Sequence, residues 1–420
     1  MAVRFNSTEK LIREILDLVE CRDELKDSAR TLGCHLSLIF NECLEECFNY
    51  KELLSNKSIL KIDSIIDAID DAINIGHWSD ISVELRRVFT LASFVKTLFY
   101  LRSHKTNMKI ENLREALQYV DRGLLMGAPF EINSELLTKV AEMLTTHIRK
   151  YFNENIGPLY EEAAVKTDSC NHKFLFENIK ACEVDSLVLP SLEQFNRLYF
   201  ETQHPVKLQG CIDHWPAKKK WKDLQYLLQI GGDRTVPVEI GTQYVDENWS
   251  QRLMTIREFV EKYYFKNEGE MTGYIAQHNL FDQIPELRED ICIPEYCSLS
   301  KDYDKSCDPE INCWFGPAGT VSSLHHDPKN NFLVQVYGMK QILLFAPQDT
   351  QYLYPFEGSL LSNTSQVDPL IPNLEIYPNF IHSKMFKCLL KEGEMLFIPQ
   401  KWWHYVVALD KSFSVSFWWQ

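Results

Sequence analysis

The sequence predicts an α+β protein in which an all-α N-terminal region precedes an antiparallel β barrel or double-sheet sandwich. In the first third of the chain, apolar residues recur every three or four positions, the period of an amphipathic helix. Beyond residue 190, short runs alternate with the period of a strand. A length of 420 residues also exceeds that of one ordinary domain. We therefore predict a helical interaction domain over residues 1–155, a linker over 156–190 and a β-rich domain over 191–420.

The helical prediction rests on runs such as the one through Leu11, Ile15 and Val19, which place one apolar stripe on each helix. Glycines such as Gly76 and Gly123 are expected to separate the helical segments. The spacing is not regular enough to assign a named repeat. Stacked amphipathic helices of this kind suit a scaffold, so we expect this half to dock a protein partner.

The β prediction rests on runs such as residues 332–336 and 412–417, in which alternate side chains are apolar and the flanks are turn residues. In the second run, small serines alternate with Phe413, Val415 and Phe417. If the serines face inward, they leave room for a ligand inside a barrel. The insert over residues 348–379, which carries several prolines, is expected to be a loop ordered by packing.

Composition and charge narrow the classes of partner. The formal net charge of −15 argues against binding to phosphate backbones, which needs lysines and arginines. A basic protein partner suits this charge, and so does simple solubility in the cytosol or nucleus. The twelve cysteines are scattered without a CxxC pair, which indicates a reducing compartment. No apolar run approaches the roughly 20 residues of a membrane helix, so no membrane association is expected.

The stretch Leu324–Pro328, LHHDP, contains a candidate metal site. Side chains two apart on a strand share a face, so His325 and Asp327 point to one side and His326 to the other. We interpret His325 and Asp327 as a chelating pair, and His326 as a surface residue or a neighbour of the ligands. Because a lone His-x-Asp pair is a weak signal, a third ligand is needed.

His404, in the run IPQKWWHYVVAL, is the candidate third ligand, although by itself the run favours a core histidine among aromatics. Two histidines and one carboxylate form the facial arrangement that non-haem Fe(II) prefers. That arrangement leaves three coordination positions open, which is what a bidentate cosubstrate and dioxygen need.

Residues 314–347 and 392–406, together with the entry segment 204–221, resemble the jumonji-C group of 2-oxoglutarate-dependent oxygenases. The resemblance covers roughly residues 190–420. It implies a double-stranded β-helix, the cupin-like jelly roll, with Fe(II), 2-oxoglutarate and O₂ as cofactor and cosubstrates. Within the family the chain is most similar to arginyl hydroxylases, which implies hydroxylation of arginine in a basic protein, such as a histone, ribosomal or chromatin-associated protein, and a location in the nucleus or cytoplasm.

The resemblance also assigns roles to individual residues. His325, Asp327 and His404 occupy the iron-ligand positions, and Lys340 occupies that of the cation that binds the distal carboxylate of 2-oxoglutarate. A buried lysine needs such an anion, because an unpaired buried charge is costly. Three further residues match positions that contact the cosubstrate or partner the lysine, although each could be structural: Tyr274, Ser322 and Asn331. Glu239 and Trp249 align with the substrate region, where a carboxylate and an aromatic face suit a guanidinium.

Other functions remain open at this point. The same iron chemistry could remove an N-methyl group from histone lysine, and the ligand triad does not separate the two reactions. The family neighbourhood has also been linked to cleavage of histone tails, although no nucleophile or second metal site for it is recognisable in the sequence. A barrel that serves only as a chromatin interaction module is the non-enzymatic alternative.

Overall fold

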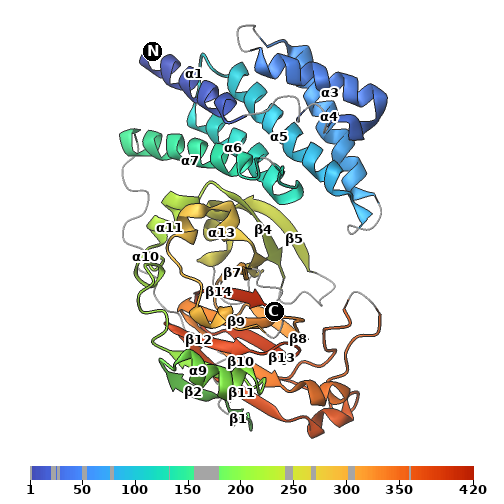
Figure 1. Cartoon of the computed structure of the whole chain (residues 1–420), viewed down its shortest axis with the longest axis vertical. Coiled ribbons are helices and arrows are strands. Elements are labelled where there is room, and N and C mark those ends of the chain that lie inside the picture. The colour runs from blue at the N-terminus through green and yellow to red at the C-terminus, as the bar shows by residue number, and fades with distance from the viewer. Residues whose placement is uncertain are drawn as a thin grey trace. The chain divides into compact units, whose positions relative to one another are not determined.

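The computed structural model describes residues 2–19, 25, 29–49, 54–75, 80–131, 133–155, 179–241, 249–265, 271–300, 308–358 and 361–420. It divides into two compact units, residues 1–159 with 231–235 and residues 160–230 with 236–420 (Figure 1). The first unit is helical and the second is β-rich, which confirms the predicted α+β class. Most of the predicted linker, residues 156–178, lies outside the described residues.

The first unit is a stack of helices built around α5. Its elements are α1 (Ala2–Asp17), the 3-10 turn η1 (Ala29–Leu32), α3 (Gly33–Phe48), α4 (Asn56–Asn74), α5 (Val83–Ser103), α6 (Ile110–Met126) and α7 (Leu136–Asn155). Helix α5 is buried on nearly every side from Val88 to Phe99, and it packs against α3, α4 and α6. A helix that is apolar all round must lie in the middle of its unit, and the amphipathic helices around it bury one face each.

Serine caps start two of these helices. The Ser55 hydroxyl accepts the Ser58 amide at the start of α4, and Ser82 accepts the Leu85 amide at the start of α5. Each cap satisfies a backbone N–H that the helix itself cannot pair.

The prediction that Gly123 separates two helical segments is wrong, because this glycine lies inside α6. A Cβ atom at this position would meet Leu137 Cδ1 at 2.6 Å and Ser93 Cβ at 2.7 Å. The glycine therefore allows α5, α6 and α7 to approach closely, and this packing gain outweighs its low helix propensity. Gly76 lies outside the described residues.

The second unit contains two sheets. The five-stranded sheet has the order β1-β11-β10-β13-β8, and the nine-stranded sheet has the order β2-β3-β12-β9-β14-β7-β6-β4-β5. The strands are β1 (Cys182–Glu183), β2 (Asp185–Val188), β3 (Val206–Gln209), β4 (Thr235–Ile240), β5 (Ser250–Thr255), β6 (Gly273–His278), β7 (Glu310–Gly316), β8 (Val321–His326), β9 (Asn330–Tyr337), β10 (Met339–Phe345), β11 (Met385–Lys391), β12 (Glu394–Ile398), β13 (Trp403–Ala408) and β14 (Ser412–Trp419). The short strands β1 and β2 lie within the stretch predicted as a linker.

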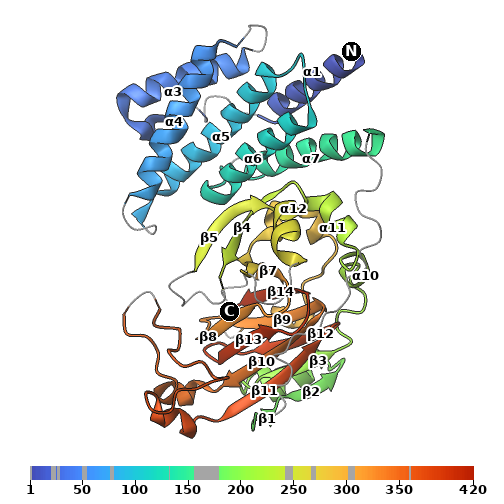
Figure 2. The same ribbon diagram turned by 180° about the vertical axis from the view of Figure 1, so that it is seen from behind.

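Short helices accompany these strands. They are α9 (Leu192–Phe195), α10 (Ala217–Lys220), α11 (Leu224–Gly231), α12 (Ile256–Phe259), α13 (Leu280–Gln283), α14 (Pro285–Arg288), the π-helical turns η3 (Asn196–Phe200) and η4 (Val260–Tyr264), and the 3-10 turns η5 (Glu295–Ser298), η6 (Pro347–Tyr352) and η7 (Pro378–His382). Figure 2 shows β8, β13, β10 and β11 side by side in one sheet, as the strand pairing requires.

Each sheet has an outer face and an inner face. On β14, Phe413, Val415 and Phe417 join the large core formed with the short helices. The alternate Ser414 and Ser416 therefore face inward, where their hydroxyls bond Gln335 and Trp314. The inner faces of both sheets share a second core that includes Leu333, Ile342 and Ile398. Side chains that alternate with the packed ones are thus directed into the barrel.

The insert between β10 and β11 covers the outer face of the smaller sheet, where Leu353, Val367 and Phe380 pack in a third core. Its residues 363–365 also extend that sheet beyond the edge strand β8. Thr364 forms a bridge with His325, and the Ser365 amide donates to the Leu324 carbonyl at 2.8 Å. Within the part of the chain that is described, no helix combines the length and apolar character needed to cross a membrane.

Candidate metal centre

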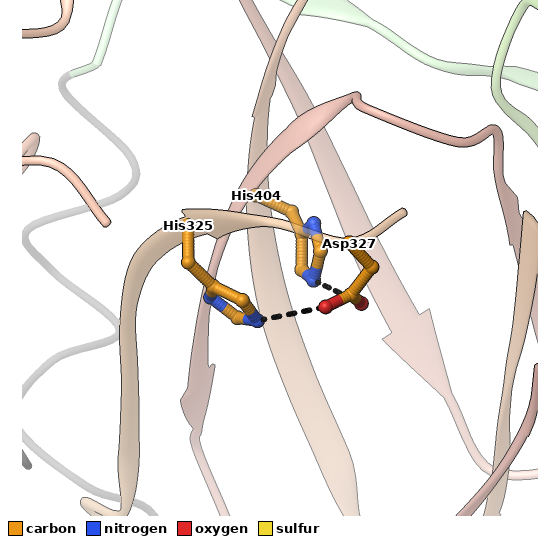
Figure 3. Close-up of side chains that lie close together, drawn as sticks. All are labelled: His325, Asp327 and His404. Atoms are coloured by element: carbon orange, nitrogen blue, oxygen red, sulfur yellow. Dashed lines mark ion pairs between the residues drawn. The ribbon is translucent and has the colours of Figure 1, made fainter. Parts of the chain in front are cut away.

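Three side chains from two neighbouring strands meet inside the barrel. His325 on β8 lies directly opposite His404 on β13, and their ring centroids are 4.2 Å apart. Asp327 follows β8, with one carboxylate oxygen 3.8 Å from His325 Nε2 and the other 3.5 Å from His404 Nε2. One ligand atom from each residue lies within 4.8 Å of the others. Figure 3 shows the three side chains turned toward a common point.

A β-bulge in β8 changes which residues of this strand point to the same side. His404 pairs with His325, whereas Val406, two residues on, pairs with Ser322, three residues back. The extra residue in β8 lets Ser322 and His325 face the same cavity, although strict alternation would separate them.

His326 lies on the opposite face of β8, as alternation predicts. It is paired with Trp403, and its ring stands edge-on to that indole at a centroid distance of 4.7 Å. Burial lowers the pKa of His326, which favours the neutral ring. Of the two adjacent histidines, only His325 is directed toward Asp327 and His404.

Hydrogen bonds to the strand backbone orient both ligand rings. His325 Nδ1 lies 2.7 Å from the Ser323 carbonyl, and His404 Nδ1 lies 3.0 Å from the Trp402 carbonyl. A bond of this kind fixes the tautomer with the proton on Nδ1 and presents Nε2 as an acceptor for a metal. Burial lowers the pKa of His404 to about 4, so its ring is neutral at physiological pH. Metal ligation requires that neutral form.

The Asp327 carboxylate favours the binding of a cation at this point. Its Oδ2 atom is buried and has no hydrogen-bond partner among the described residues. A buried carboxylate oxygen without a donor is costly, and a metal ion between it and the two histidines would remove that cost. The two-histidine, one-carboxylate donor set suits non-haem Fe(II).

Lys340 lies on β10 inside the same barrel with 1% of its surface exposed. Its Nζ atom donates to the Tyr274 hydroxyl at 3.1 Å. Burial lowers the pKa of Lys340 to about 7 and raises that of Tyr274 well above its usual value. An anion beside Nζ would restore the charged form of the lysine. The position is set by the β9–β10 turn at Gly338, where φ is +79° and a Cβ atom would meet the Lys411 carbonyl at 2.3 Å.

The ligands and Lys340 line one narrow cavity, which Tyr274, Ser322 and Asn331 also line. Asn331 presents a buried Oδ1 atom that has no hydrogen-bond partner among the described residues. The cavity is therefore lined by the unsatisfied carboxylate oxygen of Asp327, the amine of Lys340 and the unsatisfied amide oxygen of Asn331.

Glu239 and Trp249 do not line this cavity, although Glu239 is close to it. In the β4–β6 pair, Glu239 lies opposite Tyr274, so the two side chains share a face. Burial raises the pKa of the Glu239 carboxyl group, and the Trp249 indole opposes that rise. Trp249 Nε1 itself is buried and makes no hydrogen bond of standard geometry within the described part of the chain.

Comparison with known proteins identifies the family of this chain. The cupin-like domain family matches residues 192–420. The chain is 37% identical to "Lysine-specific demethylase 8" of Xenopus tropicalis over 93% of its length and 95% of the relative's. It is also 39% identical to "Jumonji C domain-containing protein 5" of Drosophila melanogaster, over 86% of each chain. The chain is a jumonji-C protein of the cupin-like family. A protein of Danio rerio, also named "Lysine-specific demethylase 8", is 40% identical over 88% of this chain and 89% of its own.

Jumonji-C proteins generally use Fe(II) and 2-oxoglutarate, and the residues of this chain fit both. His325, Asp327 and His404 would hold the metal, because their donor atoms converge and Asp327 Oδ2 lacks a partner. The resemblance to jumonji-C oxygenases drawn from residues 314–347 and 392–406 is therefore confirmed at the level of the family.

The sequence did not single out three apolar residues that line the jumonji-C cavity, namely Leu333, Ile398 and Val406. Two of them could have been found by period two, since Leu333 is two residues after Asn331 and Val406 two after His404. Of the C-terminal tryptophans in the described structure, Trp314 lines the cavity. Trp403 instead packs on the outer face of its sheet, and Trp419 joins the core formed with the short helices.

Proposed function

We propose that the chain is an Fe(II)- and 2-oxoglutarate-dependent oxygenase that oxidises a basic side chain in a protein substrate. The observation that carries the proposal is the convergence of His325, Asp327 and His404 on one point, in the same cavity as the buried Lys340. Burial of a lysine with only a hydroxyl as its partner is costly, and the distal carboxylate of a cosubstrate would remove that cost.

His325, Asp327 and His404 would hold the metal and would leave coordination positions for 2-oxoglutarate and dioxygen. When bound, the iron supplies the activation of dioxygen, coupled to decarboxylation of 2-oxoglutarate to succinate and CO₂. Lys340 would hold the distal carboxylate of the cosubstrate, with the Tyr274 hydroxyl positioning its ammonium group. Ser322 and Asn331 would complete the binding of the cosubstrate, since both line the same cavity.

The names of the relatives favour lysine demethylation over the arginine hydroxylation that the sequence resemblance implied. Proteins of Xenopus tropicalis and Danio rerio that match most of this chain carry the name "Lysine-specific demethylase 8". In demethylation, one oxygen atom enters an N-methyl C–H bond, and the product loses formaldehyde to leave N–H. The substrate would then be a basic protein such as a histone, which the net charge of −15 also suits. A nuclear location follows from this substrate.

Arginine hydroxylation remains a second candidate because of Glu239. This half-buried carboxylate lies opposite Tyr274, beside the cavity, with the Trp249 indole nearby. A carboxylate can accept two parallel N–H bonds from a guanidinium, and an indole can stack on its plane. In this reaction the oxygen atom stays on the substrate as a hydroxyl group.

Mass spectrometry of basic peptides separates the two reactions. Iron-loaded protein with 2-oxoglutarate and ascorbate is incubated with a peptide that contains both arginine and methylated lysine. A gain of about 16 mass units on arginine indicates hydroxylation, whereas a loss of about 14 on lysine with formaldehyde release indicates demethylation. Succinate is measured in parallel.

Two variants of adjacent histidines control this experiment. His325→Ala removes a proposed ligand and should abolish product, whereas His326→Ala, on the other face of the same strand, should retain it. If wild type and His325→Ala formed equally little succinate, the barrel would be a non-catalytic interaction module. The helical unit is proposed to dock a protein partner in either case.

A further inference from the structure

A second hollow is separate from the cavity that the metal ligands line. Its volume is about 480 Å³, which is within the range of small-molecule sites. It is formed where the segment before β3, the start of η6, the start of β11 and the β12–β13 loop come together. The residues that line it are Thr202, Gln203, His204, Ala346, Pro347, Gln348, Asp349, Lys384, Phe386, Gln400, Lys401 and Trp402. None of these residues lines the metal cavity.

The wall of the hollow combines aromatic rings with positive charge. The His204 ring stands edge-on to both Phe386 and Trp402, at centroid distances of 5.6 and 5.5 Å. Lys384 and Lys401 are exposed at the rim, and among the described residues neither forms an ion pair. The chain has a net charge of −15, so two lysines at one hollow without an ion pair to any described residue are unusual. They favour an anionic ligand, and the rings favour a flat one.

One carboxylate also lines the hollow, and it already has a donor. Asp349 Oδ2 accepts the backbone amide of Lys384 at 2.8 Å. This bond fixes the backbone at Lys384. The Nζ atom of Lys384 lies 5.0 Å from the Phe386 ring centroid. The charges around the hollow are therefore two lysines against one aspartate, with His204 as a further titratable group.

The backbone of the wall is strained at two of its residues. Gln203 has a positive φ of 53°, and Lys401 has one of 65°. Left-handed backbone at two residues of one hollow is strain of the kind that gathers at binding sites.

The loop that forms one side of the hollow also holds two metal ligands in place. The backbone amide of Lys401 donates to the Asp327 carbonyl at 2.7 Å. The carbonyl of the next residue, Trp402, bonds His404 Nδ1 at 3.0 Å. A ligand that shifts or stiffens this loop therefore acts on Asp327 and His404 together, without contact with either.

We propose that this hollow is a binding site for a small organic anion, a carboxylate or phosphate attached to an aromatic body, and that its occupancy changes the affinity of the metal centre. The anion lies between Lys384 and Lys401, and the aromatic body lies against His204, Phe386 and Trp402. The coupling rests on the metal site proposed above, whereas the binding itself does not.

Isothermal titration calorimetry of the metal-free full chain tests the binding. Adenosine 5′-monophosphate represents the phosphate class and hippurate the carboxylate class, and both carry an aromatic ring. Adenosine and hippuramide are their uncharged counterparts. At least one charged probe should bind about tenfold more tightly than its counterpart, the size expected for one charge-assisted contact. Equal affinities within both pairs would overturn the proposal.

Variants locate the bound probe. Lys384→Gln should weaken the charged probe by about fivefold or more, and Lys222→Gln, at a surface lysine outside the hollow, should not change it. Lys340→Met removes the cation of the metal cavity and should leave probe binding unchanged. If Lys340→Met abolished binding and Lys384→Gln did not, the probe would occupy the metal cavity and the proposal would be refuted. Circular dichroism confirms that each variant is folded.

The coupling is tested by repeating the titration with saturating Mn(II). The probe dissociation constant should change by several-fold, and the probe should change the Mn(II) dissociation constant by the same factor, as linkage requires. An unchanged probe constant in protein that binds Mn(II) would refute the coupling. Failure to bind Mn(II) at all would instead refute the proposed metal site.

Discussion

Lys340 offers a test of the account that requires no ligand. Its ammonium group is buried with 1% of the residue exposed, and burial lowers its pKa from 10.5 to about 7. Replacement by methionine keeps a similar length and removes the ionisable group. We expect Lys340→Met to be more stable than the wild type in the absence of 2-oxoglutarate, because it no longer buries a cation.

The magnitude follows from the shift in pKa. A pKa that is about 3.5 lower in the folded state than in the unfolded state corresponds to a destabilisation of the folded state by roughly 5 kcal/mol at low pH. Between pH 7 and 10.5 the unfolded state binds the proton and the folded state releases it, so wild-type stability rises with pH in this window. The advantage of the methionine variant is therefore greatest below pH 7. It should shrink by about 2 to 3 kcal/mol between about pH 6.5 and 9.

Urea denaturation followed by tryptophan fluorescence provides the assay. Eight of the nine tryptophans lie after residue 190, so the signal reports mainly on the β-rich unit. The free energy of unfolding is measured at several pH values for the wild type, Lys340→Met and the control Lys222→Met, whose surface lysine pairs with Glu392. The control should follow the wild-type pH dependence.

One result would refute this reasoning. If the difference between Lys340→Met and the wild type stayed constant from pH 6.5 to 9, the lysine would not titrate in that window. Its amine would then have an anionic partner within the protein, and the carboxylate of a cosubstrate would not be needed to neutralise it.

Further predictions concern the metal, the cosubstrate and the helical unit. Asp327→Ala should abolish Mn(II) binding, measured by electron paramagnetic resonance, because it leaves two neutral histidines as the only ligands. Tyr274→Phe should raise the KM for 2-oxoglutarate about fivefold in a succinate assay, the equivalent of one net hydrogen bond of about 1 kcal/mol, while Tyr405→Phe on the outer face should not. Gly123→Ala should destabilise the helical unit by about 2 kcal/mol in thermal circular dichroism, since its Cβ would meet Leu137 and Ser93; an unchanged melting temperature would show that the helices can separate freely.

Much of the site could be predicted because strand periodicity is a local property. Alternation alone placed His325 and Asp327 on one face of the strand and His326 on the other, as the structure has them. The convergence of His404 on that pair depends on the antiparallel pairing of β8 with β13, about 80 residues apart in sequence, and no local pattern encodes it. It was anticipated through resemblance to a family.

Other features depended on packing between distant segments. The bulge that brings Ser322 and His325 to one cavity is visible only in the register of β8 against β13. Gly123 was predicted to end a helical segment because glycine is a poor helix former, yet the approach of Leu137 and Ser93 determines its place inside α6. The second hollow is assembled from four separate segments, so its lining residues share no sequence motif.

The proposed function requires that His325, Asp327 and His404 hold one ferrous ion and leave room beside it for 2-oxoglutarate. Chelation of Fe(II) by the keto acid produces a charge-transfer band, which anaerobic visible absorption spectroscopy detects. We expect this band for the wild type and for His326→Ala, and we expect its loss in His325→Ala. Absence of the band in the wild type, or its persistence at full strength in His325→Ala, would show that these residues do not form the proposed site.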